Sequence, residues 1–225
     1  MFFRTAWLVL RKDIAIEAKS WEVLTTTLFF AVSCVLIFAF AFVKDGRAMD
    51  DAAAGILWIA ISFSGTLALG RTFERERYGE TLRALLLAPA PRAALYVGKL
   101  LGMVALLALA ELLLVPLVAL LFQAALFSRP LLLLALLAGG TIGFCAVGTL
   151  FAAMLVRARS RDVLLPILLY PIVIPVIIAG VRGTAALLGA TPDEPTAMMW
   201  IGVLGAFDVV FVTLALWTFE PLMTE

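Results

Sequence analysis

The chain has 225 residues, of which 64% are hydrophobic and 15% are charged, and its mean hydropathy is +1.11. Because a soluble domain is roughly half apolar and about a quarter charged, some of these side chains must face lipid, which excludes a soluble enzyme. The formal charge is only +1 and there is no histidine, so the composition predicts no nucleic-acid partner and excludes a Ser-His-Asp triad, an HExxH zinc site and a histidine-ligated haem within the chain.

Residues 1–22 predict an amphipathic helix that lies in the membrane interface. Its apolar residues recur at helical spacing: Phe3, Trp7, Leu10, Ile14, Ala18 and Trp21. Polar anchors surround this stripe: Arg4, Arg11, Lys12 and Lys19. A helix of this kind lies flat with its tryptophans at the level of the headgroups. A cleavable signal is not expected, since the first long apolar run begins only at Val23. The simpler interpretation is a positive flank that only sets topology.

Six apolar runs are long enough to cross a bilayer as helices, which takes about 20 residues. They are 23–43, 52–70, about 100–122, 131–156, 163–181 and 198–219. Membrane strands would be shorter and would alternate in polarity. The predicted fold is therefore an all-α integral membrane protein, a single transmembrane domain over residues 1–225.

The basic residues of the connections predict the orientation of this domain. Twelve lie in the N-terminal segment and in the second-to-third and fourth-to-fifth connections, against four in the other connections. Lys99 lies at the mouth of the third span. Because Lys and Arg accumulate on the cytoplasmic side, both termini are predicted to be cytoplasmic.

The connection 71–94 differs from the other loops in length and pattern. Its start, 71–78, can continue the second span out of the membrane, and Gly79 then interrupts it. Thr81 is a plausible N-cap, three leucines share one helical face, and prolines end the helix: Leu82, Leu85, Leu86, Pro89 and Pro91. The segment predicts a short amphipathic helix, which either rests on the headgroups or docks into a groove of a cytoplasmic partner.

Two carboxylates lie near the middle of the spans, Glu111 in the third and Asp208 in the sixth. An ionised carboxylate in hydrocarbon is costly, so each is expected to face the interior of the bundle. One interpretation is a polar path or coupling site. The other is a neutral carboxyl that holds helices together through a hydrogen bond to Ser, Thr or a backbone carbonyl.

Glycines and prolines mark the fourth and fifth spans. Gly139 and Gly143 have the spacing that lets helices approach closely. Three prolines interrupt the hydrogen bonding of the fifth span and predict kinks or a partly re-entrant segment: Pro166, Pro171 and Pro175. Residues 182–197 then become an external re-entrant or loop element. The cysteines Cys34 and Cys145 lie inside apolar runs and are expected to be packing residues.

The run Glu74-Arg75-Glu76…Gly79-Glu80-Thr81-Leu82…Leu85-Leu86…Pro89…Arg92…Gly98-Lys99 resembles the coupling-helix signature of ABC-2-type transporter permeases. With its length, its six spans and the proline-rich LLPILLYPIVIPVIIAG, the whole chain resembles more closely the heme exporter protein B (CcmB) family of bacterial cytochrome c maturation. The resemblance implies ATPase-docking residues, namely Glu74, Glu76, Gly79, Glu80, Thr81, Leu82, Leu85, Leu86 and Pro89.

The resemblance also implies the partners and the location. It places the chain in the bacterial inner membrane, with a CcmA-like P-loop ATPase, a second copy of the chain, CcmC-like and CcmD-like membrane subunits and a CcmE-like haem chaperone. ATP would be bound by the partner, since the chain has no GxxxxGK[ST] loop. Haem would be a substrate, released on its chaperone or exported. No catalytic or metal site and no bound cofactor is predicted.

Two other functions remain open from the sequence. One is a general ABC-2 exporter subunit for a lipid, drug or glycan. The other is a membrane scaffold or integral enzyme, which lacks support because no nucleophile, base or metal-ligand set accompanies the two acids. Weaker haem ligands are available in place of histidine, namely Met103, Met154, Met198, Met199 and Tyr170.

Overall fold

The computed structural model describes residues 2–42, 50–78, 91–158, 160–189 and 191–222. The helices of these residues are α1 (Phe2–Ser20), α2 (Glu22–Phe42), α3 (Asp50–Tyr78), α5 (Arg92–Phe122), α6 (Pro130–Met154), α7 (Arg161–Leu188) and α8 (Glu194–Leu222), with 3-10 turns η1 (Leu126–Ser128) and η2 (Leu155–Arg157). The described residues contain no strand, in agreement with the predicted all-α fold.

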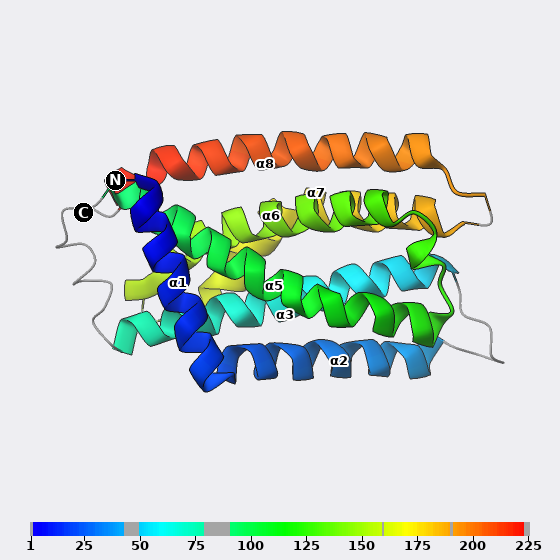
Figure 1. Cartoon of the computed structure of the whole chain (residues 1–225), viewed down its shortest axis with the longest axis horizontal. Coiled ribbons are helices and arrows are strands. Elements are labelled where there is room, and N and C mark those ends of the chain that lie inside the picture. The colour runs from blue at the N-terminus through cyan, green and yellow to red at the C-terminus, as the bar shows by residue number, and fades with distance from the viewer. Residues whose placement is uncertain (1, 43–49, 79–90, 159, 190, 223–225) are drawn as a thin grey trace.

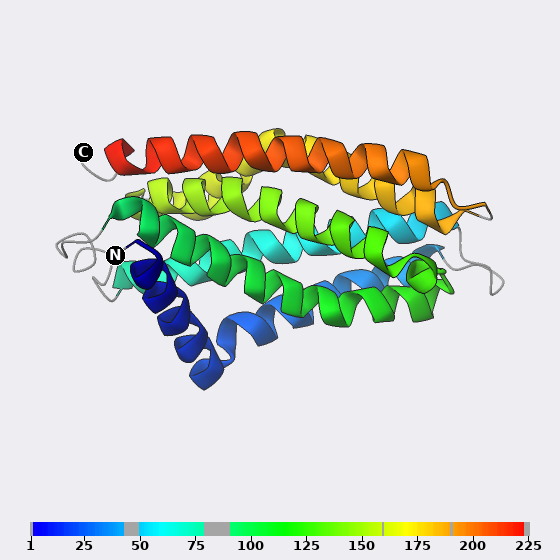
Figure 2. The ribbon, with the colours of Figure 1, turned by 45° about the horizontal axis from the view of Figure 1, so that its top comes forward.

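Six of these helices, α2 to α8, form an up-and-down bundle, and α1 crosses one end of it at a steep angle (Figures 1 and 2). Each of the six is long and apolar enough to span a membrane, so the predicted spans are confirmed within the described residues. The C-terminal end of α8 lies at the same end of the bundle as α1 (Figure 1). That arrangement is the one expected for an even number of spans.

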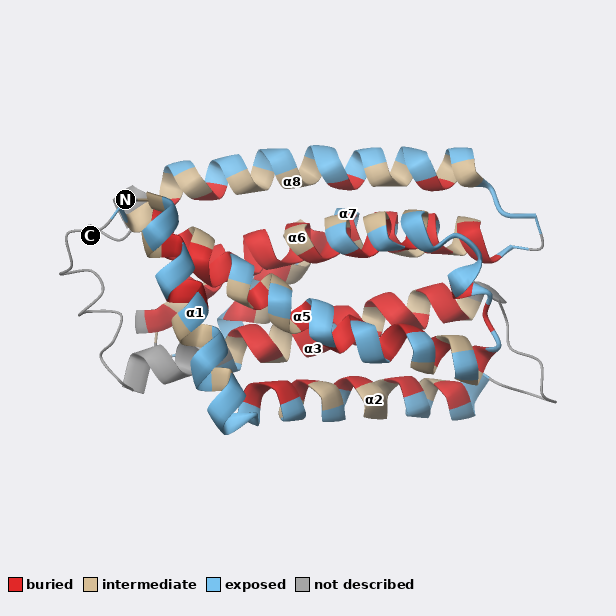
Figure 3. Ribbon diagram, viewed as in Figure 1, coloured by how far each residue is buried: buried red, intermediate tan, exposed pale blue. Residues whose placement is uncertain are grey.

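Helix α6 is the centre of the bundle, because it packs against α3, α5, α7 and α8. Figure 3 shows α6 and α3 largely buried, whereas α8 and α2 expose one whole side. That outer surface carries large apolar side chains: Phe29 and Phe40 of α2, and Val209 and Trp217 of α8. An apolar exterior around a packed interior is the arrangement of a membrane-embedded bundle.

A buried tryptophan fixes the contact of α3 with α6 and α7. The ring of Trp58 lies against Gly140 of α6 and Gly180 of α7, so closely that a Cβ on either glycine would overlap it. Its Nε1 donates a hydrogen bond of 3.0 Å to Thr184 Oγ1. The two glycines therefore form a slot for the indole, and the threonine satisfies its polar atom.

The proline-rich helix α7 runs without interruption from Arg161 to Leu188 through all three prolines. Its buried residues recur every three or four positions, for example Leu165, Leu169 and Val173, whereas the prolines lie on the exposed or half-buried side. Packing along the opposite face thus keeps the segment helical despite the missing N–H groups. The prediction of a partly re-entrant segment is therefore wrong, because α7 is one continuous helix.

The external element expected over residues 182–197 is also shorter than predicted. Helix α7 continues to Leu188 and α8 begins at Glu194, because residues such as Gly183 and Thr184 pack into the bundle. Asp193 precedes α8 and accepts hydrogen bonds from Thr196 N at 3.0 Å and Thr196 Oγ1 at 2.6 Å. These bonds lower the pKa of the Asp193 carboxyl. They also cap the N-terminus of α8.

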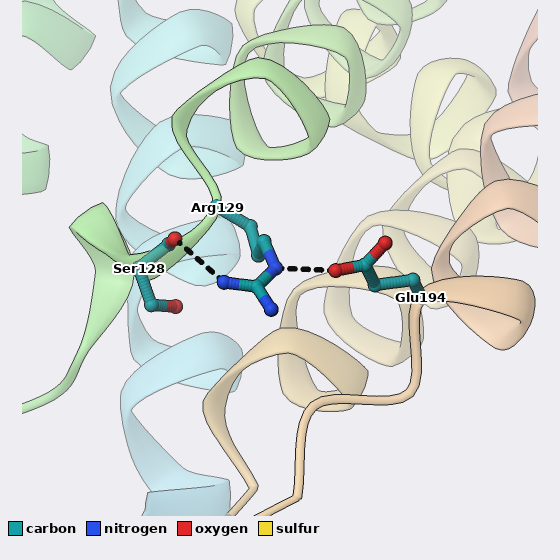
Figure 4. Close-up of polar contacts among 3 residues, drawn as sticks. All are labelled: Ser128, Arg129 and Glu194. Atoms are coloured by element: carbon teal, nitrogen blue, oxygen red, sulfur yellow. Dashed lines mark hydrogen bonds and ion pairs between the residues drawn. The ribbon is translucent and has the colours of Figure 1, made fainter.

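An ion pair joins the α5–α6 connection to the start of α8 at this end of the bundle. Arg129 donates from Nε to the Glu194 carboxylate and from Nη1 to Ser128 O at 3.2 Å (Figure 4). Both charged side chains remain substantially exposed. A pair of this kind contributes at most about 1 kcal/mol, so it orients the connection more than it stabilises the bundle.

Candidate functional site

The segment predicted to dock an ATPase is only partly within the described residues. Helix α3 continues to Tyr78, past the apolar stretch that ends at Arg71, and includes Glu74 and Glu76, as predicted for the continuation of the second span. The other residues assigned to docking lie outside the described residues: Gly79, Glu80, Thr81, Leu82, Leu85, Leu86 and Pro89. The docking helix itself stays a prediction.

A buried arginine holds α3 where this extension begins. Arg161, the first residue of α7, donates from Nη2 to Gly70 O at 2.7 Å and to Leu69 O at 3.1 Å. Its side chain is buried. A buried guanidinium on backbone carbonyls is a strong, charge-assisted contact, so the start of α7 is fastened to the part of α3 that leads to residue 78. From the sequence, Arg161 counts only as one of the basic residues of the fourth-to-fifth connection.

Glu111 of α5 is buried, with 7% of its surface exposed, and accepts a hydrogen bond from the Thr141 hydroxyl of α6. This is the arrangement in which a carboxyl and a threonine hold two helices together. Glu111 Oε1 and Thr141 Oγ1 are both in the α5–α6 contact. The hydrogen-bonded interpretation of this carboxyl is thus the one that its geometry matches.

Asp208 of α8 faces the glycine pair of α6. A Cβ placed on Gly143 would lie 2.6 Å from Asp208 Oδ1, and one on Gly139 would lie 3.1 Å from Leu204 Cβ. Gly139 and Gly143 therefore lie at the α6–α8 contact and leave room for the carboxyl of the other helix. Oδ1 is buried and has no hydrogen-bond partner among the described residues.

The two intramembrane acids do not form one site. Thr141 lies midway between Gly139 and Gly143 in the sequence, and a residue two positions away on a helix points to nearly the opposite side. Glu111 therefore meets one side of α6 and Asp208 meets the other, at the same depth. Glu111 and Asp208 are therefore not brought together into one polar site.

An ion pair between α1 and α5 was not predicted from the sequence. Lys99 Nζ lies 2.8 Å from Asp13 Oδ2, and Lys12 Nζ lies 3.2 Å from Asp13 Oδ1. The adjacent Gly98 allows the contact, since a Cβ there would lie 2.7 Å from Val9 Cβ of α1. The available signal was that the N-terminal helix carries two acidic residues, Asp13 and Glu17, among its basic ones. The predicted helix 1–22 is thus present as α1, docked on α5 through Ala6, Val9 and Leu10.

The comparisons with known proteins agree with this architecture. The family model described as "CcmB protein" matches residues 4–221. The chain belongs to the CcmB family. It is 27% identical over 195 residues to "Heme exporter protein B" of Pseudomonas aeruginosa, covering 87% of this chain and 86% of the relative. The protein of the same name from Haemophilus influenzae is 27% identical over 207 residues, covering 92% and 91%.

A third relative, "Heme exporter protein B" of Paracoccus denitrificans, is 30% identical over 177 residues, which is 78% of this chain and 79% of that protein. The matches thus extend over most of each chain. The resemblance inferred from the coupling segment and the proline-rich helix is therefore confirmed at the level of the CcmB family.

In this CcmB-family chain the candidate weak haem ligands are dispersed. Met103 is buried in the core, Met154, Met198 and Met199 are exposed on two other helices, and the Tyr170 hydroxyl accepts a hydrogen bond of 3.3 Å from Thr66. The described residues include no group of three or more Cys, Asp or Glu side chains able to hold a metal. Cys145 is buried, Cys34 is half-buried, and both are free thiols.

Proposed function

We propose that this chain is the membrane subunit of an ATP-driven complex for haem export in bacterial cytochrome c maturation. The observation that carries the proposal is membership of the CcmB family over residues 4–221, together with relatives named "Heme exporter protein B". The subunit would lie in the inner membrane, as one of two copies. Its partners would be a CcmA-like ATPase, CcmC-like and CcmD-like membrane subunits and a CcmE-like haem chaperone.

The chain itself would not be catalytic. Helix α3, which extends to Tyr78, would transmit the movement of an ATPase bound to the segment that follows it. Because Arg161 fastens α7 to Leu69 and Gly70, a displacement of that extension would move α3 and α7 together. Trp58 of α3 makes a second contact with α7, at Gly180 and Thr184, and it also packs against Gly140 of α6.

The orientation proposed for the subunit places α1, the end of α3 and the start of α7 in the cytoplasm. Support comes from the charge asymmetry of the connections, twelve basic residues against four. It also comes from the location of α1 and the C-terminal end of α8 at the same end of the bundle. Both termini would then be cytoplasmic, on the side where the ATPase is supplied with ATP.

The proposed role is energy coupling for release of the haem-loaded chaperone, rather than storage of haem in this chain. The absence of histidine from the sequence and the dispersal of Met103, Met198 and Tyr170 over separate helices both weigh against stable axial ligation. Haem would then be the cargo of the complex and not a resident cofactor of this chain.

A pull-down of the tagged chain from native membranes in mild detergent tests the proposal. We expect a P-loop ATPase together with a haem-handling membrane protein. An ATPase with lipid or glycan machinery would instead support the general exporter. Recovery of no ATPase, from a preparation that retains other known complexes, would overturn the proposal.

The docking face is tested in the same assay by a double variant, Leu82→Asp with Leu85→Asp. Ala84→Asp is the matched control, since it adds a carboxylate to the opposite side of the same predicted helix. We expect loss of the ATPase from the double variant and its retention with the control. Equal recovery of the ATPase from both would show that these leucines are not the docking face.

A further inference from the structure

A pocket of about 390 Å³ lies between α1, the first turn of α2 and α5. Its lining includes Lys12, Asp13, Glu17, Trp21, Lys99 and Leu109. Binding pockets for small molecules measure roughly 300–1,000 Å³, so this volume is large enough for a ligand. We name it the α1–α5 pocket.

The polarity of the α1–α5 pocket changes along α5. Lys99 forms its polar end, where Asp13 and Lys12 are also paired. Met103, Leu106 and Leu109 continue the lining along the same helix. Ten residues of helix span about 15 Å, so the lining passes from charged to fully apolar over the depth of a headgroup and the first part of an acyl chain.

Exposed apolar residues in the lining indicate that in a bilayer the pocket would open toward lipid. Four apolar residues that line it are about half exposed, namely Ile14, Ile16, Trp21 and Leu109. In a bilayer these side chains contact lipid, so an occupant can enter from the leaflet that contains α1. A phospholipid is the amphiphile present there in excess.

The charges of the pocket indicate the kind of headgroup. Its charged residues are Lys12, Lys99, Asp13 and Glu17, two cations and two carboxylates, with a formal sum of zero. An anionic headgroup would meet a carboxylate for every lysine. A zwitterion instead matches both signs, with its phosphate at Lys12, the more exposed of the two lysines, and its ammonium at a carboxylate.

Trp21, which lines the pocket, has a strained backbone conformation. Trp21 joins α1 to α2 with φ 53°, the left-handed region that side chains other than glycine rarely adopt. Such a conformation costs roughly 1–2 kcal/mol and persists where the surroundings hold it. Here both flanking helices bond to it, Trp21 N to Glu17 O at 2.7 Å and Thr25 N to Trp21 O at 2.9 Å. These bonds hold the backbone of Trp21, and Trp21 is part of the pocket lining.

We infer that the α1–α5 pocket binds one zwitterionic phospholipid of the surrounding leaflet, with the headgroup at Lys12, Asp13, Glu17 and Lys99 and one acyl chain along Leu106 and Leu109. This site does not depend on the proposed role in haem export. It would fix the position of α1 relative to α5 by filling the space between them.

Native mass spectrometry of the purified chain tests the inference with three probes. They are dioctanoyl-phosphatidylethanolamine, dioctanoyl-phosphatidylglycerol and the soluble headgroup glycerophosphoethanolamine. We expect one ethanolamine lipid to bind about tenfold more tightly than the anionic lipid, and no binding of the headgroup alone. Equal or tighter binding of the anionic lipid, or binding of the headgroup alone, would overturn the inference.

Two pairs of variants locate the bound lipid. Ala105→Trp fills the pocket, whereas Ala108→Trp adds the same ring on an exposed position of α5 outside the lining. Lys12→Met removes the cation proposed to meet the phosphate, and Lys19→Met removes an exposed lysine that does not line the pocket. We expect the first of each pair to weaken ethanolamine lipid binding about tenfold and the second to leave it unchanged. The same affinity within each pair would place the lipid elsewhere.

A photoreactive amino acid at Ala105 keeps the test decisive if a variant fails to fold. After irradiation of native membranes, we expect an adduct with the mass of a phospholipid. An adduct with another protein as the dominant product would show that a polypeptide occupies the pocket, and would overturn the inference.

Discussion

Lys99 of α5 and Asp13 of α1 form an ion pair of 2.8 Å whose side chains are only 8% and 16% exposed. The pair joins the helix that crosses the end of the bundle to a membrane span (Figure 1). At Gly98, the residue before Lys99, the absence of a side chain lets α5 and α1 approach each other closely. This charged contact and this close crossing therefore both hold α1 against α5.

Lys99→Met should loosen α1 from α5, because Asp13 then loses its less exposed partner. We expect a loss of about 2 kcal/mol in stability, seen as a lower melting temperature in detergent and as faster maleimide labelling of a cysteine placed at Ala6. Combining Lys99→Met with Asp13→Leu should restore most of the stability, since no buried charge is left alone. Equal labelling of the single variant and the parent would contradict this.

Gly180→Ala should be one of the most destabilising small substitutions in the bundle. Its Cβ would overlap the Trp58 ring, a rigid group that Thr184 and Gly140 also confine. We expect a loss of about 3 kcal/mol, measured by thermal unfolding in detergent. Gly202→Ala is the control, because nothing lies within 4 Å of its Cβ, and it should gain about 0.5–1 kcal/mol.

Gly143→Ala should displace Asp208 and loosen α8. The added Cβ would lie 2.6 Å from Asp208 Oδ1, so we expect a loss of about 2 kcal/mol. Asp208→Ala in the same chain should recover part of that loss by removing the obstructing oxygen. A double-mutant cycle on melting temperature measures the coupling. Strictly additive effects would mean that the carboxyl does not occupy the space left by Gly143.

Thr141→Val should destabilise the chain more than Glu111→Gln does. The valine leaves the buried Glu111 carboxyl without its hydroxyl donor, a cost of about 1–3 kcal/mol, whereas the glutamine keeps an acceptor for Thr141. We expect Glu111→Gln to retain cytochrome c maturation in cells. Loss of maturation with unchanged stability would show instead that the carboxyl takes part in coupling.

Arg161→Gln should reduce maturation while leaving the ATPase attached. It removes the charged contact with Leu69 O and Gly70 O, so that the start of α7 follows the end of α3 less closely. We expect maturation to fall about tenfold, with normal recovery of the complex in a pull-down. Arg182→Gln is the control, because Arg182 is exposed near the other end of α7. Equal activity of both variants would contradict a role for Arg161 in transmission.

Hydropathy and the family resemblance were sufficient to predict the six spans and the all-α membrane fold. Apolar runs of about 20 residues are directly visible in the sequence, and a helix is the simplest way to satisfy their backbone. The prolines of α7 misled the prediction because a local rule about one hydrogen bond says nothing about packing on the other face. There, Leu165 and Val173 hold the helix together.

The candidate sites were only partly predictable for a related reason. A buried acid such as Glu111 or Asp208 is conspicuous in an apolar run, but its partner depends on which helices are neighbours. The pairing of Lys99 with Asp13 joins residues of two helices that are separated by two spans in the sequence. No periodicity within one helix reports such a contact, so it became apparent only in the folded bundle.

Helices α1 and α2 meet at the single residue Trp21, and hydrogen bonds tie it to both. Apart from Trp21, no linker residue separates the two helices. A sideways push on α1, from a change in the lipid surface or from a neighbouring subunit, cannot be absorbed by a flexible linker. It reaches α2 through this joint and α5 through the Asp13–Lys99 pair, so a movement of the surface helix is passed to two spans at once.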